Sequence, residues 1–239
     1  AVERAYSAQL KRTLARAEKS ALAAASVGAA MAIALQSSTA VAALASGFAS
    51  GGLLAGATGL ALVLGAYFGS AIVASILSFD LSLLIAPLII AGGVLFLRGT
   101  ERRTKQLGRM VLGIAFVLLS LQMVSEATAP WRGSELLGAA VDYLKGDPWT
   151  GFFVAALITW LSYSSVASVL VIITFGAAGI IPLEIATALV LGANLGGTLI
   201  AFGMTRGGDV RARRIAIGAI MLRGGAALAC LVLLQVWPL

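Results

Sequence analysis

Apolar runs long enough to cross a lipid bilayer constrain this chain more than any other feature of its sequence. A membrane-spanning helix needs about 20 consecutive apolar residues. Runs that reach or approach this length lie at 52–79, 81–97, 110–125, 180–203 and 215–236. Charged residues make up only 11% of the chain, about half the share of a soluble domain. The sequence therefore predicts an all-α polytopic membrane protein, of the multi-pass kind found in the bacterial inner membrane.

Composition also excludes several other classes of protein. No polar stretch is long enough to form a second, soluble core, so residues 1–239 are expected to form a single transmembrane domain. The lone Cys230 excludes a disulfide framework within the chain, and the lack of histidine excludes an imidazole proton relay or a histidine-bound metal. Nothing resembles a nucleophile elbow, so an enzyme is not expected. The chain starts at Ala1 without a methionine, which leaves open that residues precede it.

The basic residues are distributed as membrane topology requires. Fourteen of the 17 lysines and arginines lie in three short segments, 1–20, 98–109 and 204–214. We therefore expect no nucleic-acid partner, and the positive-inside rule assigns all three segments to the cytoplasm. An even number of crossings must then separate the first two. The apolar runs 52–79 and 81–97 already supply two crossings between these segments. Residues 21–50 must therefore make no net crossing, because they are too few for two full spans.

A re-entrant hairpin fits this requirement. Such a hairpin would use about 15 residues inward, a break, and about 12 residues outward over 21–50. The same count of crossings makes 151–177 a second hairpin that enters from the opposite side. Two hairpins from opposite faces are typical of transporters with inverted repeats. The alternative is that both segments are ordinary tilted spans and that 98–109 violates the charge rule.

An internal repeat supports the first reading. Residues 36–73 match the chain without gaps when they are shifted by 127 positions, and 12 of the 38 positions are identical. The match includes a Ser-Ser pair and a six-residue identity between 61–66 and 188–193. An odd number of crossings separates the two units, so we expect them to be inverted. Repeat 1 is predicted at about 10–125 and repeat 2 at about 135–236.

Each repeat is predicted to contain a re-entrant helical hairpin with a polar break and then a transmembrane helix interrupted by glycines. The glycine segments are Gly65–Gly69 and Gly192–Thr198. Irregular backbone at membrane depth is tolerated only where it is buried in protein or lines an aqueous cavity. Free N–H groups after a break favour an anion, whereas carbonyl and amide oxygens suit a hard cation such as sodium. The alternative is that these small residues only pack helices together, but the duplicated register favours a site.

The same residues resemble the type II sodium-dependent phosphate cotransporter family and its bacterial members. Gln36-Ser37-Ser38-Thr39-Ala40 matches the first hairpin motif of that family, and Gly192–Thr198 matches its second glycine motif. Pro148 through Thr159 to Ser164-Ser165 matches the approach to the second hairpin, and the resemblance spans roughly residues 10–220. It implies two hairpin tips that meet near the membrane centre, and alternating-access transport of inorganic phosphate coupled to sodium.

The resemblance also implies a set of site residues. Phosphate would be bound by Ser37, Ser38, Thr39, Tyr163, Ser164, Ser165 and Asn194. Sodium would be bound by oxygens of Gln36, Ser38, Thr159, Ser165, Asn194 and Thr198. Tyr163 stands where the family has Gln, and Tyr67 where it has Asn. These two departures motivate the alternative of another small anion or solute, and a non-transporting membrane subunit is a further alternative; a homodimer also stays open.

Two charged residues lie outside these motifs. Arg223 comes nine residues after Arg214, roughly 13 Å along a helix. An intramembrane arginine is a candidate for anion attraction or for pairing between helices, although it could instead snorkel or bind a helix carbonyl. Glu184 follows Pro182 and is predicted to lie in a first helical turn at the outer interface.

Overall fold

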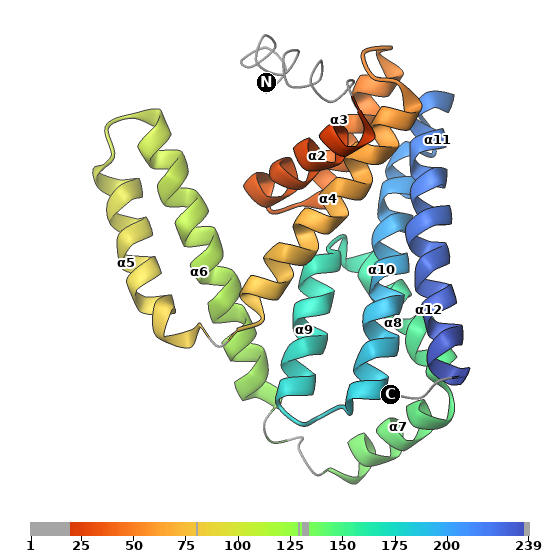
Figure 1. The fold of residues 1–239 in the computed structure, drawn as a ribbon. Helices are drawn as coiled ribbons and strands as arrows, with labels where there is room; N and C mark the ends of the chain where they lie inside the picture. The colour runs from red at the N-terminus through yellow and green to blue at the C-terminus, as the bar shows by residue number, and fades with distance from the viewer. Residues whose placement is uncertain (1–19, 80, 129, 131–133, 237–239) are drawn as a thin grey trace.

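The computed structural model of the protein describes residues 20–79, 81–128, 130 and 134–236, most of which are helical (Figure 1). The helices are α2 (Ala21–Leu35), α3 (Ser38–Ser50), α4 (Gly56–Leu77), α5 (Ser82–Arg98), α6 (Arg102–Thr128), α7 (Glu135–Gly146), α8 (Pro148–Ser162), α9 (Ser165–Ala177), α10 (Leu183–Thr205), α11 (Val210–Ala219), the π-helical turn η2 (Ile220–Gly224) and α12 (Gly225–Val236). Within the described residues, four stretches are long and apolar enough to cross a membrane: Gly56–Leu77, Arg102–Ala127, Leu183–Thr205 and Val210–Val236. The predicted all-α multi-pass membrane protein is confirmed.

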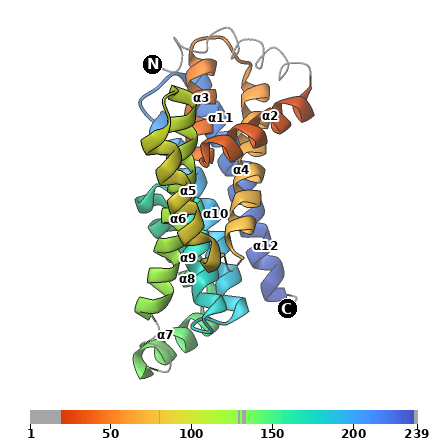
Figure 2. The ribbon, with the colours of Figure 1, turned by 90° about the vertical axis from the view of Figure 1, so that its left-hand side faces the viewer.

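The connections between helices segregate to the two ends of the molecule. The α5–α6 and α10–α11 connections, which belong to two of the three basic segments, lie at the same end (Figures 1 and 2). Helix α7 lies at the opposite end. The third basic segment, 1–20, falls almost entirely outside the described residues. The arrangement satisfies the even number of crossings that the charge rule requires between the two described basic segments.

Each predicted hairpin consists of two short helices joined at a break. Helix α2 ends at Gln36 and α8 ends at Tyr163, and these are the two described non-glycine residues with positive φ, 51° and 54°. A left-handed residue terminates a helix because the chain can no longer follow the right-handed path. The next residue then caps the following helix: Ser37 Oγ accepts from Ala40 N at 3.1 Å. Ser164 Oγ accepts from Ala167 N at 3.2 Å in the same way.

The two units agree in the bounds of their helices. Shifting α2 and α3 by 127 residues gives the bounds of α8 and α9, and the same shift takes the start of α4 to the start of α10. Figure 1 shows α4 running from the α11 end toward α5, and α10 running from the α7 end toward α11. The α2–α3 hairpin starts and ends at one end of the molecule, and the α8–α9 hairpin at the other. Membrane re-entry and the outer limits of the two repeats stay predictions.

The predicted glycine interruption is wrong for both long helices. Helices α4 and α10 run without a break through Gly65 and Gly192. These glycines instead let a second helix cross at very short range. A Cβ on Gly65 would lie 1.9 Å from the carbonyl oxygen of Ala25, and one on Gly192 would lie 2.0 Å from that of Phe152. Because Ala25 and Phe152 are also 127 residues apart, the α2–α4 and α8–α10 crossings are equivalent.

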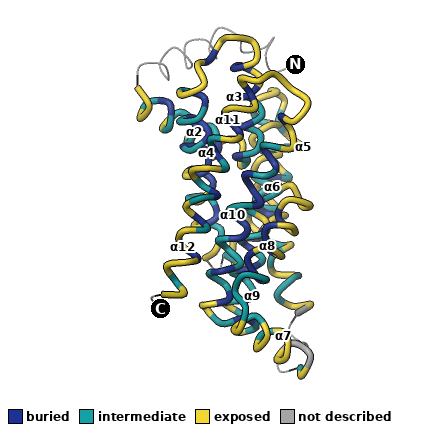
Figure 3. Tube along the Cα trace, turned by 90° about the vertical axis from the view of Figure 1, so that its right-hand side faces the viewer, coloured by how far each residue is buried: buried dark blue, intermediate teal, exposed yellow. Residues whose placement is uncertain are grey.

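Burial concentrates along the two crossings and between the long helices (Figure 3). Buried side chains of α2, α3, α4 and α11 form one core cluster, whereas α5 buries only Ile85 and Gly92. Large apolar side chains remain exposed on many helices, for example Leu83 at 90%. Lipid is as apolar as these side chains, so a membrane protein can leave them on its surface without cost.

Asp147 begins α8 as its cap. Its carboxylate accepts from the side chain of Thr150 and from the backbone N–H of Thr150, the latter at 3.2 Å. These donors hold the pKa of Asp147 below its ordinary value of 3.8. A lowered pKa in the folded state stabilises the fold above the ordinary pKa, and this contribution disappears as pH falls through the lowered value.

We therefore expect the melting temperature of the detergent-solubilised protein to fall as the pH is lowered below about 4. The Asp147→Asn variant should lose part of this acid dependence, because its amide oxygen still accepts but does not titrate. Melting curves of both proteins at a series of pH values would test this. An acid dependence of equal steepness in the variant would contradict it.

Candidate functional site

A partly open cavity that contains a cluster of polar side chains lies where the two units meet. It has a volume of about 190 Å³ and lies between α4, α9, α10 and η2. Its polar lining comes from Ser70, Ser75, Ser78, Ser165, Asn194 and Arg223, and the apolar remainder from Ala71, Ala74, Val166, Val169, Ile173 and Val190. A cluster of hydroxyls, an amide and a guanidinium in an otherwise apolar protein indicates a site for a polar solute.

Ser165 comes to this cavity because of the break before α9. Ser164 takes the capping position, which leaves Ser165 as the first residue of the helix, only 6% exposed. On the facing helix, a Cβ on Gly197 would lie 3.2 Å from Ser165 Oγ and 3.4 Å from Arg223 Nη1. The missing side chain of Gly197 thus lets Ser165 and Arg223 both approach the backbone of α10 closely, at the edge of the cavity that they line. Ser165 belongs to the N-terminal turn of α9, where backbone N–H groups favour an anion.

The guanidinium of Arg223 forms hydrogen bonds through two of its nitrogen atoms and none through the third. Its Nε donates to Asn194 Oδ1 at 3.1 Å, and its Nη2 donates to the same oxygen. The guanidinium carbon lies 4.0 Å from the centre of the Tyr67 ring, close enough for a cation–π contact. Nη1 is buried and has no hydrogen-bond partner. The Asn194 amide nitrogen donates to the carbonyl oxygen of Val190 at 3.0 Å, which fixes the orientation of Asn194.

Buried polar atoms without a partner gather in this region. Four such atoms occur among the described residues: Tyr67 Oη, Ser70 Oγ, Thr159 Oγ1 and Arg223 Nη1. Buried polar groups normally have a hydrogen-bond partner, and each exception calls for an explanation such as a ligand or water. Ser70 and Arg223 line the cavity, and Tyr67 contacts Arg223. Three of the four orphaned groups are therefore hydrogen-bond donors at or next to one cavity.

The residues predicted for the site fall into two groups. Ser165 and Asn194 line the cavity. Thr159 and Thr198 are completely buried nearby, on helices α8 and α10. Thr198 Oγ1 donates to Leu195 O at 2.7 Å, whereas Thr159 Oγ1 has no partner. The structure thus places two predicted residues, both from the second unit, on the lining of the cavity.

The remaining predicted residues do not line this cavity. Gln36, Ser37, Ser38 and Thr39 belong to the first hairpin, where Ser38 is 4% exposed and occupies the position equivalent to Ser165. In the second hairpin, Tyr163 is 64% exposed and Ser164 is the helix cap. Their roles in binding stay predictions.

Sequence reasoning missed the contribution of α4. Ser70, Ser75 and Ser78 line the cavity, and Tyr67 was singled out only as a departure from a motif. Ser75 and Ser78 share a helix face because they are three residues apart, but Ser70 and Ser75 are five apart and do not, so the spacing gave only a partial signal. Ser70 is also the register equivalent of Gly197, which faces Ser165 in the second unit.

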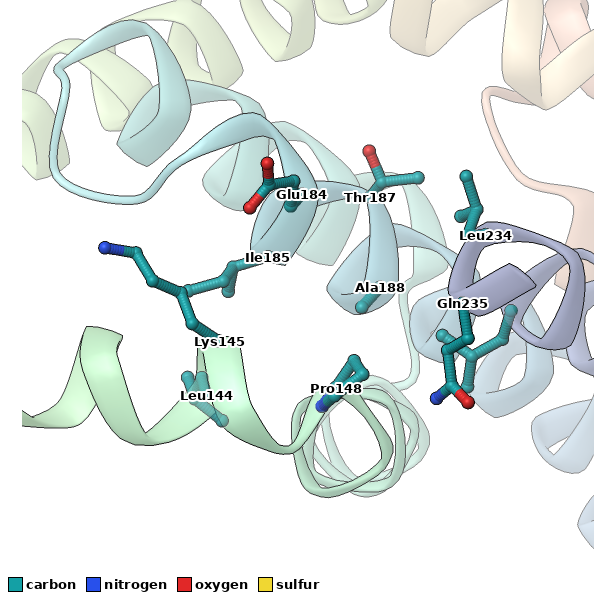
Figure 4. Close-up of a pocket in the computed structure, with 10 residues that line it drawn as sticks. Leu144, Lys145, Pro148, Glu184, Ile185, Thr187, Ala188, Leu234 and Gln235 are labelled. Carbon is teal, nitrogen blue, oxygen red and sulfur yellow. The ribbon is translucent and has the colours of Figure 1, made fainter. Parts of the chain in front are cut away.

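A second pocket lies at the α7 end of the molecule (Figure 4). It has a volume of about 240 Å³, and Figure 4 shows Lys145 of α7 and Glu184 of α10 beside it. Glu184 is exposed in the first turn of α10, the position that the sequence predicts. None of the predicted binding residues lines this pocket, so the cavity at Ser165 and Arg223 is the stronger candidate site.

Comparison with known proteins adds independent information. A family model described as Na+/Pi-cotransporter matches residues 1–126 and 133–234. The chain is 36% identical over 222 residues to the Escherichia coli protein named "Putative inorganic phosphate export protein YjbB", a match that covers 93% of the chain and 41% of YjbB. It is 25% identical over 187 residues to "Uncharacterized protein YqeW" of Bacillus subtilis, covering 78% of the chain and 61% of YqeW. The chain thus spans about two fifths of the length of the YjbB relatives it matches. No solved structure matches it at a significant level.

Proposed function

The chain belongs to the Na+/Pi-cotransporter family, and on this premise we propose that it moves inorganic phosphate across the membrane together with sodium, by alternating access. A cotransporter family is a family of transporters, so the prediction that the chain is not an enzyme is confirmed. The name of the YjbB relative describes inorganic phosphate export, which supports phosphate as the substrate.

The observation that carries this proposal is the donor-rich cavity at the start of α9. Ser165, Ser70 and Arg223 all line it, and the two hydroxyls and the guanidinium can each donate a hydrogen bond. An oxyanion offers several acceptor oxygens and one or two negative charges, so it matches a set of donors that includes one cation. The N-terminus of α9 adds a favourable helix dipole on the same side.

Alternating access needs a site that both units share. The cavity meets this requirement, because α4 comes from the first unit, α9 and α10 come from the second, and α4 and α10 run in opposite directions in Figure 1. A relative movement of the two units would open such a cavity first toward one end and then toward the other.

Sodium is proposed to bind away from the guanidinium, since two cations repel each other strongly in a site of low dielectric constant. This requirement disfavours Asn194 as a sodium ligand in the conformation described, because its Oδ1 accepts from Arg223. Thr159 is the better candidate. Its Oγ1 is buried without a partner, and oxygen atoms are the ligands that hard cations prefer.

Purified protein in liposomes tests the proposal. We expect a sodium gradient to stimulate the uptake of radiolabelled phosphate, and a potassium gradient of equal ionic strength to have no such effect. Thr159→Val keeps the shape of the side chain but removes its oxygen, so it should raise the sodium concentration needed for half-maximal flux roughly tenfold, as loss of one ligand to a charge does. Protein that melts cooperatively yet shows no phosphate flux would contradict the proposed function.

A further inference from the structure

We propose that Arg223 is a ligand of the transported phosphate and supplies the positive charge that balances it inside the membrane. This inference rests on the proposed function and assigns one residue of the same site. Four features of the structure carry it: the depth of Arg223, the neutrality of its partners, the free edge of its guanidinium, and its contact with both units.

Arg223 is the middle residue of a continuous helix that runs from Val210 to Val236, with 13 residues on either side. Arg214, the last residue of the basic segment that the charge rule assigns to the cytoplasm, lies about 13 Å away along the helix, and the opposite end of the helix lies about 20 Å away. An arginine side chain cannot extend that far to reach water or lipid headgroups at the interface, so snorkelling does not account for it. Its charge must be accommodated within the protein.

The protein supplies only neutral partners for that charge. The guanidinium contacts the amide oxygen of Asn194 and the ring of Tyr67. In the described part of the chain, no carboxylate forms an ion pair with Arg223. A buried cation without a counterion is strongly unfavourable, so an anionic ligand would complete the arrangement.

The guanidinium of Arg223, which lines the cavity, also has an edge that Asn194 does not occupy. Asn194 occupies the edge formed by Nε and Nη2, which leaves the edge formed by Nη1 and Nη2. Nη1 is buried without a partner and lies close to Gly197, which also faces Ser165. Two parallel N–H groups on one edge match two oxygens of a phosphate. The π-helical turn that contains Arg223 marks a local departure from the regular helix, as is common at functional sites.

Arg223 contacts equivalent positions of the two units. Tyr67 of α4 and Asn194 of α10 are separated by the 127-residue shift that relates the units, and both touch the guanidinium. A phosphate bound to Arg223 would therefore lie between the units, where their relative movement can expose it to either side.

Phosphate affinity of the purified, detergent-solubilised protein tests the inference. We expect Arg223→Gln to raise the Kd for inorganic phosphate roughly tenfold to hundredfold, as loss of a charge-assisted contact does. Arg223→Lys keeps the charge but loses the paired N–H groups, so its Kd should lie between those of Arg223→Gln and the wild type. Arg214→Gln is the matched control, because it makes the same change of charge at an exposed position nine residues earlier, and its Kd should equal that of the wild type.

The outcomes separate this inference from the proposed function. A folded Arg223→Gln protein that binds phosphate with the wild-type Kd would overturn the role of Arg223 while phosphate transport stands. If Arg223→Gln does not fold, the comparison rests on Arg223→Lys, and a wild-type Kd in that variant would overturn the requirement for a paired donor edge. Wild-type protein that binds no phosphate would contradict the proposed function itself.

Discussion

Alanine at Gly65 or at Gly192 is expected to prevent the chain from folding. The added Cβ would lie 1.9 Å from the carbonyl oxygen of Ala25 in the first case and 2.0 Å from that of Phe152 in the second. Both obstacles are backbone atoms inside helices, so neither can rotate away as a side chain could. The helices would have to separate by more than an ångström along their whole crossing, which also breaks the neighbouring contacts of Gly69 or Gly196.

We expect each substitution to cost more than about 3 kcal/mol, beyond the range of most single substitutions. Gly93→Ala and Gly113→Ala are matched controls, since a Cβ at either position would meet nothing within 4 Å. In these controls the better helix propensity of alanine should leave stability unchanged or raise it by up to about 1 kcal/mol. The yield of monodisperse protein and its melting temperature measure the difference. A Gly192→Ala protein that behaves like Gly113→Ala would show that the crossing is not as close as described.

The helix lengths of the hairpins could be predicted closely from the sequence. The charge rule limited how many times each segment could cross, and the repeated Ser-Ser pair placed the break. The expected lengths of about 15 and 12 residues compare with 15 and 13 residues in α2 and α3. Gln36 and Tyr163 both adopt the left-handed conformation despite different side chains, so the position in the repeat determines the break more than the residue type.

The role of the glycines could not be predicted in the same way. A glycine-rich segment in an apolar run is compatible with an interrupted helix and with a close helix crossing. Only the position of a second helix distinguishes the two, and that position depends on tertiary contacts. In the structure the carbonyl oxygen of Ala25 lies close to Gly65, and that of Phe152 lies close to Gly192. These glycines therefore serve close helix crossings.

The candidate site could be predicted only in part, for a related reason. Ser165 and Asn194 lie in motifs and were found, but Ser70 and Tyr67 come to the cavity from the other unit. Arg223 was a candidate from its depth alone. Its pairing with Asn194 depends on how α10 packs against the π-helical turn, a contact between residues 29 positions apart that no local pattern encodes.

Ser165→Ala should lower phosphate affinity with little effect on stability, and Ser164→Ala should do the reverse. The two serines are adjacent, but Ser164 Oγ accepts from Ala167 N as the cap of α9, while Ser165 lines the cavity. Loss of a cap costs about 1 kcal/mol of stability. Loss of a hydroxyl donor to an anion corresponds to roughly a tenfold to hundredfold rise in Kd.

Measuring the phosphate Kd and the melting temperature of both variants separates the two roles. Ser120→Ala is a suitable control, because Ser120 is exposed and its hydroxyl donates only to the carbonyl oxygen of Phe116 in its own helix. A Ser165→Ala protein with a wild-type Kd and a lowered melting temperature would indicate that Ser165 is a packing residue. That result would favour the alternative in which the duplicated Ser-Ser pair only packs helices together. Of the donors named above, Ser70 and Arg223 alone would then remain to bind the oxyanion.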